Sequence, residues 1–77
     1  MARADKIFAG NRLRAVRERH GLSQGAFAAR LGVSVSYLSQ METDVRPITV
    51  SVLLALGREF AVDLSEFAQD DASRLAA

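Results

Sequence analysis

The most restrictive feature of this sequence is residues 24–42, where two helix-length stretches are separated only by Gly32, Val33 and Ser34. Glycine after a helix readily adopts the left-handed backbone that ends it, and serine caps the start of the next helix. Ala28 is small enough to let the two helices approach closely. This spacing predicts a helix-turn-helix with helices over 24–31 and 35–42.

Capping residues and apolar spacing predict further helices on both sides of this unit. We expect one over about 9–19, ended by a left-handed Gly21, and one over about 50–60 after an N-cap at Thr49. Asp63 and Glu66 are spaced as a capping box for a last short helix ending near Phe67. Pro47 makes residues 43–48 a loop. The predicted fold class is all-α, a compact bundle of four to five helices.

The helix over 50–60 carries more apolar residues than one buried face of a small bundle needs. We expect its buried stripe to consist of Val50, Leu53, Gly57 and Phe60, flanked by Leu54 and Leu56. Part of the set Val52, Leu54 and Leu56 should then remain outside. Two alternatives could cover these exposed side chains: Phe67 or Leu75 from a second copy, or the last helix of the same chain.

Composition excludes several classes of function. The chain of 77 residues has no Cys and one His, so we expect no disulfide, metal site or cofactor. The acidic pairs Glu42 with Asp44 and Asp70 with Asp71 lack any accompanying nucleophile or phosphate-binding loop, so we expect no enzyme. The longest apolar run, residues 52–56, is too short to span a membrane, which favours a cytoplasmic protein.

Charge is distributed unevenly along the chain. The net charge is only +1, but residues 1–20 carry six basic and two acidic side chains, and residues 63–77 carry one basic and four acidic. Arg3 and Lys6 precede the first helix and form either a groove-binding arm or a disordered end. Exposed arginines on the first helix serve either to attract DNA or simply to solvate the surface.

The outer face of the segment 35–42 has an unusual composition. Leu38 and Met41 define its inward stripe, and its outward positions carry no Lys, Arg or acidic residue. They are Val35, Ser36, Ser39 and Gln40. Glutamine can pair with adenine through two atoms, serine can bond to a base edge, and valine can contact a thymine methyl. These side chains therefore predict a base-reading helix.

Several short motifs occur here in a characteristic order: Gly21-Leu22-Ser23-Gln24, Leu31-Gly32-Val33-Ser34, Tyr37-Leu38-Ser39, Glu42 and Arg46-Pro47. Over roughly residues 8–67 the chain resembles the Cro and phage-repressor type, or XRE, helix-turn-helix family. More narrowly, residues 8–14 and 36–42 are similar to N-terminal domains of bacterial regulators of short-chain fatty acid metabolism.

The resemblance implies a lambda repressor-like fold and double-stranded DNA as partner, bound by a homodimer on a near-palindromic operator. It also implies roles for individual residues. Base-reading positions are Val35, Ser36, Ser39 and Gln40, while positions that touch phosphate or support the reading helix are Ser23, Gln24, Ser34, Tyr37, Thr43 and Arg46. Arg17 and Glu42 match a structural salt bridge.

Two positions depart from the family pattern. Ala26 stands where a glutamate often completes a capping box, and Asp44 stands where a glycine is common. Aspartate tolerates positive φ better than most residues, but its charge would lie near the expected phosphates.

We therefore predict an N-terminal arm (1–8), a DNA-binding domain (9–67) and a C-terminal tail (68–77) in a repressor. The alternative is a protein-interaction module, antitoxin-like or an adaptor, built on the same helices.

Overall fold

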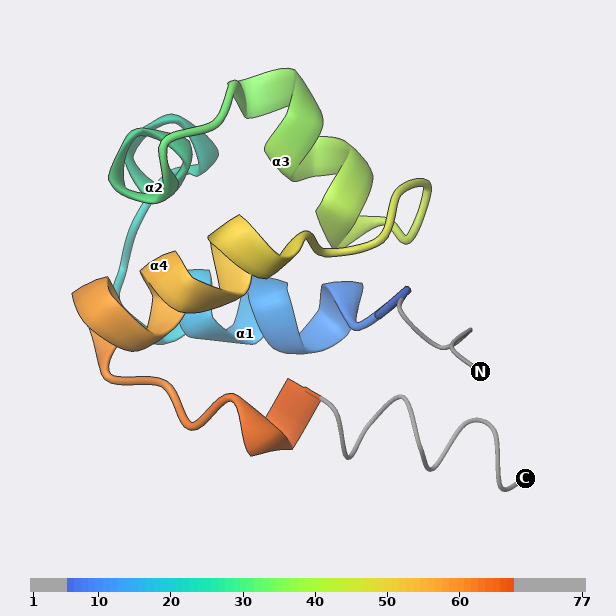
Figure 1. The fold of residues 1–77 in the computed structure, drawn as a ribbon. Coiled ribbons are helices and arrows are strands. Elements are labelled where there is room, and N and C mark those ends of the chain that lie inside the picture. The colour runs from blue at the N-terminus through green and yellow to red at the C-terminus, as the bar shows by residue number, and fades with distance from the viewer. Residues whose placement is uncertain (1–5, 68–77) are drawn as a thin grey trace.

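Residues 6–67, the part of the chain that the computed structural model describes, contain four helices and a short helical turn (Figure 1). The helices are α1, Gly10–Arg19; α2, Gln24–Leu31; α3, Val35–Glu42; and α4, Val50–Phe60. These bounds confirm the all-α fold class and all four predicted helices. The predicted tail and residues 1–5 of the predicted arm lie outside the described residues.

Local sequence determines where α2, α3 and α4 begin. Each follows a residue whose hydroxyl accepts a hydrogen bond from a backbone N–H three positions later, which satisfies one donor of the first turn. The distances are 3.1 Å for Ser23 with Ala26, 3.0 Å for Ser34 with Tyr37 and 3.2 Å for Thr49 with Val52. Gly21 and Gly32 have the positive φ expected at helix ends, 65° and 77°.

The core lies where α2 packs against α3 and α4 while α1 packs against α3. The largest fully buried side chains come from every helix and from the final turn: Phe27, Phe67, Leu13, Leu38, Met41, Leu56 and Val52. The Phe27 ring lies 5.2 Å, centre to centre, from that of Phe60 on α4. This shared core holds α3 along one side of the bundle (Figure 1).

The predicted buried stripe of α4 was wrong in part. Val50 is 69% exposed and Leu54 57%, whereas the buried side chains are Val52, Ala55 and Leu56. Residues 52–56 are apolar on all sides of the helix, so periodicity does not define which side packs inward. Phe67 is fully buried within its own chain, as the single-chain alternative required.

Two smaller features complete the described chain. The backbone N–H of Ile48 donates to the Ile7 carbonyl at 2.8 Å, an isolated bridge that places the segment before α1 beside the segment before α4. The Asp63 carboxylate accepts from the backbone and hydroxyl of Ser65, at 3.1 and 2.8 Å. The predicted capping box was therefore wrong, because the nearer Ser65 offers both donors and the N–H of Glu66 donates to the Asp63 carbonyl. Within residues 6–67 no helix is long and apolar enough to cross a membrane.

Candidate nucleic-acid interface

The outer face of α3 carries no charged side chain. Val35 is 47% exposed, Ser36 is exposed, and Ser39 and Gln40 are half-buried. The one charged residue in α3, Glu42, is buried at 4% exposure. The four predicted base-reading residues therefore form a single surface of methyl, hydroxyl and carboxamide groups, which are the groups that can read base edges.

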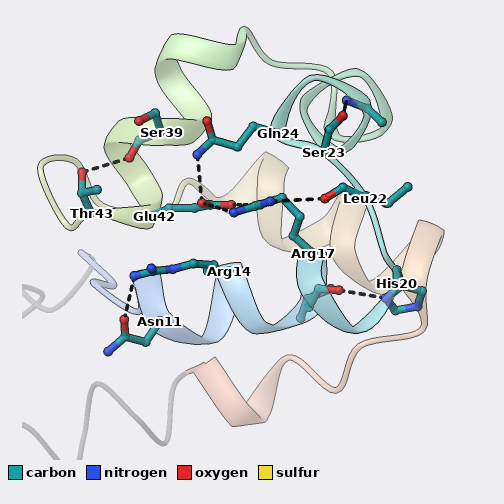
Figure 2. Close-up of polar contacts among 12 residues, drawn as sticks. Asn11, Arg14, Arg17, His20, Leu22, Ser23, Gln24, Ser39, Glu42 and Thr43 are labelled. Atoms are coloured by element: carbon teal, nitrogen blue, oxygen red, sulfur yellow. Dashed lines mark hydrogen bonds and ion pairs between the residues drawn. The ribbon is translucent and has the colours of Figure 1, made fainter.

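The buried carboxylate of Glu42 joins the first three helices (Figure 2). Arg17 of α1 forms two hydrogen bonds with it, from Nε to Oε2 at 2.8 Å and from Nη2 to Oε1 at 3.2 Å. Gln24 of α2 donates its Nε2 to Oε1 at 3.0 Å. The hydrogen bond to Glu42 raises the pKa of Arg17 above its ordinary value, against the opposing effect of burial. The ion pair expected from the resemblance is present and anchors the C-terminal end of α3.

The side chains of Gln24 and Ser23 both bond within the helical bundle in this structure. The amide of Gln24 is bonded to Glu42, and the hydroxyl of Ser23 is bonded to the backbone of α2. Ser34 caps α3 in the same way. The first turns of α2 and α3 are thus each capped by a serine hydroxyl. The N-terminus of a helix carries the positive end of its dipole, which favours a phosphate nearby.

Arg46, beyond the end of α3, contacts two residues of that helix. Its Nε donates to Oε1 of Gln40 at 2.5 Å, and its guanidinium carbon lies 5.8 Å from the centre of the half-buried Tyr37 ring. The N–H groups of Val45 and Arg46 also donate to the Gln40 carbonyl, at 2.8 and 3.1 Å. The hydrogen bond between the Arg46 and Gln40 side chains had no signal in the sequence.

Thr43 ends α3 and bonds back to it. Its hydroxyl donates to the carbonyl of Ser39 at 2.9 Å and is 3.4 Å from that of Gln40. In Figure 2 the Thr43 side chain turns toward Ser39. Thr43 thus satisfies carbonyl groups that the helix end leaves open.

Asp44 has the positive φ that its place in the family pattern implied, 63°. Its Oδ1 accepts from the backbone N–H of Gly10 at 2.9 Å, so its charge is directed at the start of α1. Ala9, the residue before α1, makes no side-chain cap. Sequence reasoning missed this bond, although a helix without its own cap needs an acceptor from elsewhere.

Three further basic side chains bond to residues outside α3. Arg14 bonds to Asn11 at 3.3 Å (Figure 2), and Arg30 bonds to Glu59 at 3.1 Å and lies over the Phe60 ring. His20 is held at the end of α1 through Nδ1, 2.9 Å from the Val16 carbonyl. Within the described residues no group of His, Cys, Asp or Glu side chains could hold a metal ion.

Comparison with known proteins places this geometry in a family. A helix-turn-helix family model matches residues 13–67. The crystal structure of the restriction-modification controller protein C.AhdI from Aeromonas hydrophila is 31% identical, with a TM-score of 0.69, and the match covers 84% of this chain and 98% of that one.

The chain also matches part of two longer curated proteins. The propionyl-CoA carboxylase regulator of Cereibacter sphaeroides is 46% identical over 94% of this chain. The HTH-type transcriptional regulator RamB of Mycobacterium tuberculosis is 49% identical over 94% of this chain. The chain spans only 16% and 15% of these relatives' lengths. It belongs to the helix-turn-helix family of DNA-binding transcription regulators, of the XRE type.

Proposed function

We propose that this chain binds a near-palindromic operator in double-stranded DNA as a homodimer and represses transcription in the cytoplasm. One observation carries the proposal, namely the uncharged exposed face of α3. A helix that only packs against its own bundle normally carries charged side chains on its outer face. A helix that reads bases in the major groove can use exposed polar and methyl groups of this kind to contact base edges.

The remaining contacts of the interface suit the same role. Phosphates on either side of the groove would be bound by the N-termini of α2 and α3. Ser36, Ser39 and Gln40 would bond to base edges, with Val35 against a thymine methyl. We assign no catalytic step and no cofactor to this surface.

The direct test is selection from randomised duplex DNA at near-physiological salt. We expect an inverted repeat with half-site centres about 10 base pairs apart, one helical turn. Ser36→Ala should relax preference at one position of each half-site, whereas Arg58→Met, on the far end of α4, should leave the motif unchanged. A folded chain that enriches no motif would rule out sequence-specific binding.

The alternative, a protein-interaction module, is favoured by exposed apolar side chains at Val45, Val50 and Leu54. Salt separates the two functions. Binding that neutralises Z phosphates weakens with a log–log slope near −0.9Z, while an apolar protein interface barely responds. Loss of binding to the selected duplex between 50 and 200 mM salt is the expected result.

Dimerisation is proposed from the same exposed residues of α4. Val50 and Leu54 lie one helical turn apart and form the apolar surface that a second copy would cover. Leu54→Lys should shift the mass measured by light scattering toward the monomer, with Ala29→Lys, a change at an exposed residue of α2, as the control. Equal masses for both variants would exclude this surface as the dimer interface.

Repression is tested by placing the selected operator across a promoter in cell-free transcription. The chain should lower transcript yield, and a duplex with scrambled half-sites should not respond. We further propose target genes in short-chain acyl metabolism, because one relative is named a regulator of propionyl-CoA carboxylase.

A further inference from the structure

The carboxamide of Gln40 has a defined orientation in this structure. Its Oε1 lies 2.5 Å from Nε of Arg46, a residue six positions further along the chain. A guanidinium has donors and no acceptor, so the amide atom that faces it must be the oxygen. The NH2 group at Nε2 is therefore the end of the Gln40 carboxamide that has no described partner, while the oxygen is directed at Arg46.

Arg46 is itself held by contacts that are independent of this bond. Its backbone N–H and that of Val45 both donate to the Gln40 carbonyl, which folds the loop back over the end of α3. The guanidinium also lies over the Tyr37 ring, 5.8 Å from its centre. Backbone and aromatic contacts thus place the donor beside the Gln40 oxygen before any DNA is bound.

This orientation changes which base Gln40 can read. Pairing with adenine needs the amide oxygen and nitrogen together, since adenine presents one donor and one acceptor in the major groove. Guanine presents two acceptors, N7 and O6, and the carboxamide NH2 group of glutamine carries two donor hydrogens. An amide whose oxygen is directed at Arg46 and whose NH2 group is left to the ligand therefore matches the two acceptors of guanine better than the donor and acceptor of adenine.

We propose that Arg46 is a positioning residue that commits Gln40 to guanine and against adenine. The inference rests on the proposed function and adds to it the identity of one base. A residue that only bound phosphate would strengthen binding to all sequences alike. Arg46 instead would change the order of preference at a single base pair.

The test compares base preference in four proteins: the unaltered chain, Gln40→Ala, Arg46→Met and Arg58→Met. Gln40→Ala identifies the base pair that Gln40 reads, because preference is lost there. Arg58→Met removes an equal charge from a side chain whose described partner is Glu59 alone. Affinities for the four duplexes that differ at that pair are then measured at one salt concentration.

We expect the unaltered chain and Arg58→Met to favour guanine over adenine at this pair by about tenfold. In Arg46→Met that ratio should fall to one or reverse toward adenine, with preferences elsewhere in the half-site retained. Preference for adenine in the unaltered chain would overturn the inference. So would an equal loss on all four duplexes in Arg46→Met.

A measurement without DNA separates this inference from the proposed function. In the NMR spectrum of the free chain, the Nε–H of Arg46 should exchange with water more slowly than that of Arg58, and Gln40→Ala should abolish the difference. Equal exchange in the unaltered chain would overturn the inference while leaving DNA binding intact. An absence of any selected motif would remove the proposed function and the inference together.

Discussion

The backbone N–H of Gly10 donates to Oδ1 of Asp44 at 2.9 Å, so the start of α1 is capped by the loop that follows α3. This bond replaces the local cap that Ala9 does not supply. It also places a carboxylate at the positive end of the α1 dipole. Asp44 therefore shapes the turn after α3 and fixes the start of α1 against it.

Asp44→Ala should lower the free energy of unfolding by about 1–2 kcal/mol. The change removes a helix cap, worth about 1 kcal/mol, and places alanine at φ 63°, a backbone conformation that aspartate tolerates better than alanine does. Urea unfolding followed by circular dichroism measures the loss.

Two further substitutions separate these contributions. Asp44→Asn keeps an acceptor and tolerates the backbone, so it should stay close to the unaltered chain. Asp44→Gly relieves the backbone but removes the cap, and should fall between Asn and Ala. Equal stability of the Gly and Ala variants would show that backbone conformation contributes nothing at this position.

The Arg17–Glu42 pair should be strongly coupled. Glu42→Ala leaves the Arg17 guanidinium, whose side chain is 17% exposed, without its carboxylate, and should cost about 3 kcal/mol. A double-mutant cycle with Arg17→Met should give a coupling energy of about 1–3 kcal/mol. The exposed pair Arg30 with Glu59 is the control and should couple much more weakly, because solvent screens it. Similar couplings in the two pairs would contradict a structural role for Glu42.

The elements that sequence defined well are those fixed by neighbours in the chain. Ser23, Ser34 and Thr49 act through backbone groups three residues away, so their roles were readable from local spacing. The cap on Gly10 comes from a residue 34 positions away, which no local pattern encodes.

The same distinction explains what was missed at the interface and on α4. The choice of Val52 over Val50 as a buried residue depends on which neighbours the helix meets. The orientation of Gln40 depends on how the loop returns to α3. Ala61 after α4 adopts a left-handed backbone at φ 55°. Because this position is neither glycine nor asparagine, its residue type offers no signal for that conformation. Local sequence thus predicts which residues form the candidate site, and tertiary contacts decide which of their atoms are available.

Asp63 should make stability depend on pH in the acid range. The hydrogen bond from the Ser65 hydroxyl, followed by that from its backbone N–H, holds the pKa of Asp63 below its ordinary value. A lowered pKa in the folded state means that the stabilisation is present above the ordinary aspartate pKa and is lost as pH falls through the folded value.

The difference in unfolding midpoint between the unaltered chain and Asp63→Asn should therefore be constant near neutral pH and shrink below about pH 4. Ser65→Ala removes the hydroxyl that lowers the pKa of Asp63 most, and should therefore reduce the pH-dependent part of the difference in midpoint. A difference that grows on acidification would give the opposite sign and contradict the assignment.

Gly10→Ala and Gly25→Ala should have opposite effects on stability. A Cβ at Gly10 would lie 2.7 Å from the Met41 carbonyl oxygen and against the Glu42 carbonyl, both backbone atoms that cannot move aside cheaply. At Gly25 the nearest atom to a Cβ is the Ser23 hydroxyl oxygen at 3.9 Å, an ordinary contact. Alanine is the better helix former at both positions, by about 0.5–1 kcal/mol.

Thermal unfolding should show this contrast directly. Gly25→Ala should raise the unfolding midpoint by a few degrees, because only the helix-forming gain acts there. Gly10→Ala should lower it, because overpacking costs about 1–3 kcal/mol and exceeds that gain. The same variant should also weaken the bond to Asp44, since the N–H of residue 10 must shift away from α3. A rise in midpoint for both variants would mean that α1 and the end of α3 do not approach as closely as the structure shows.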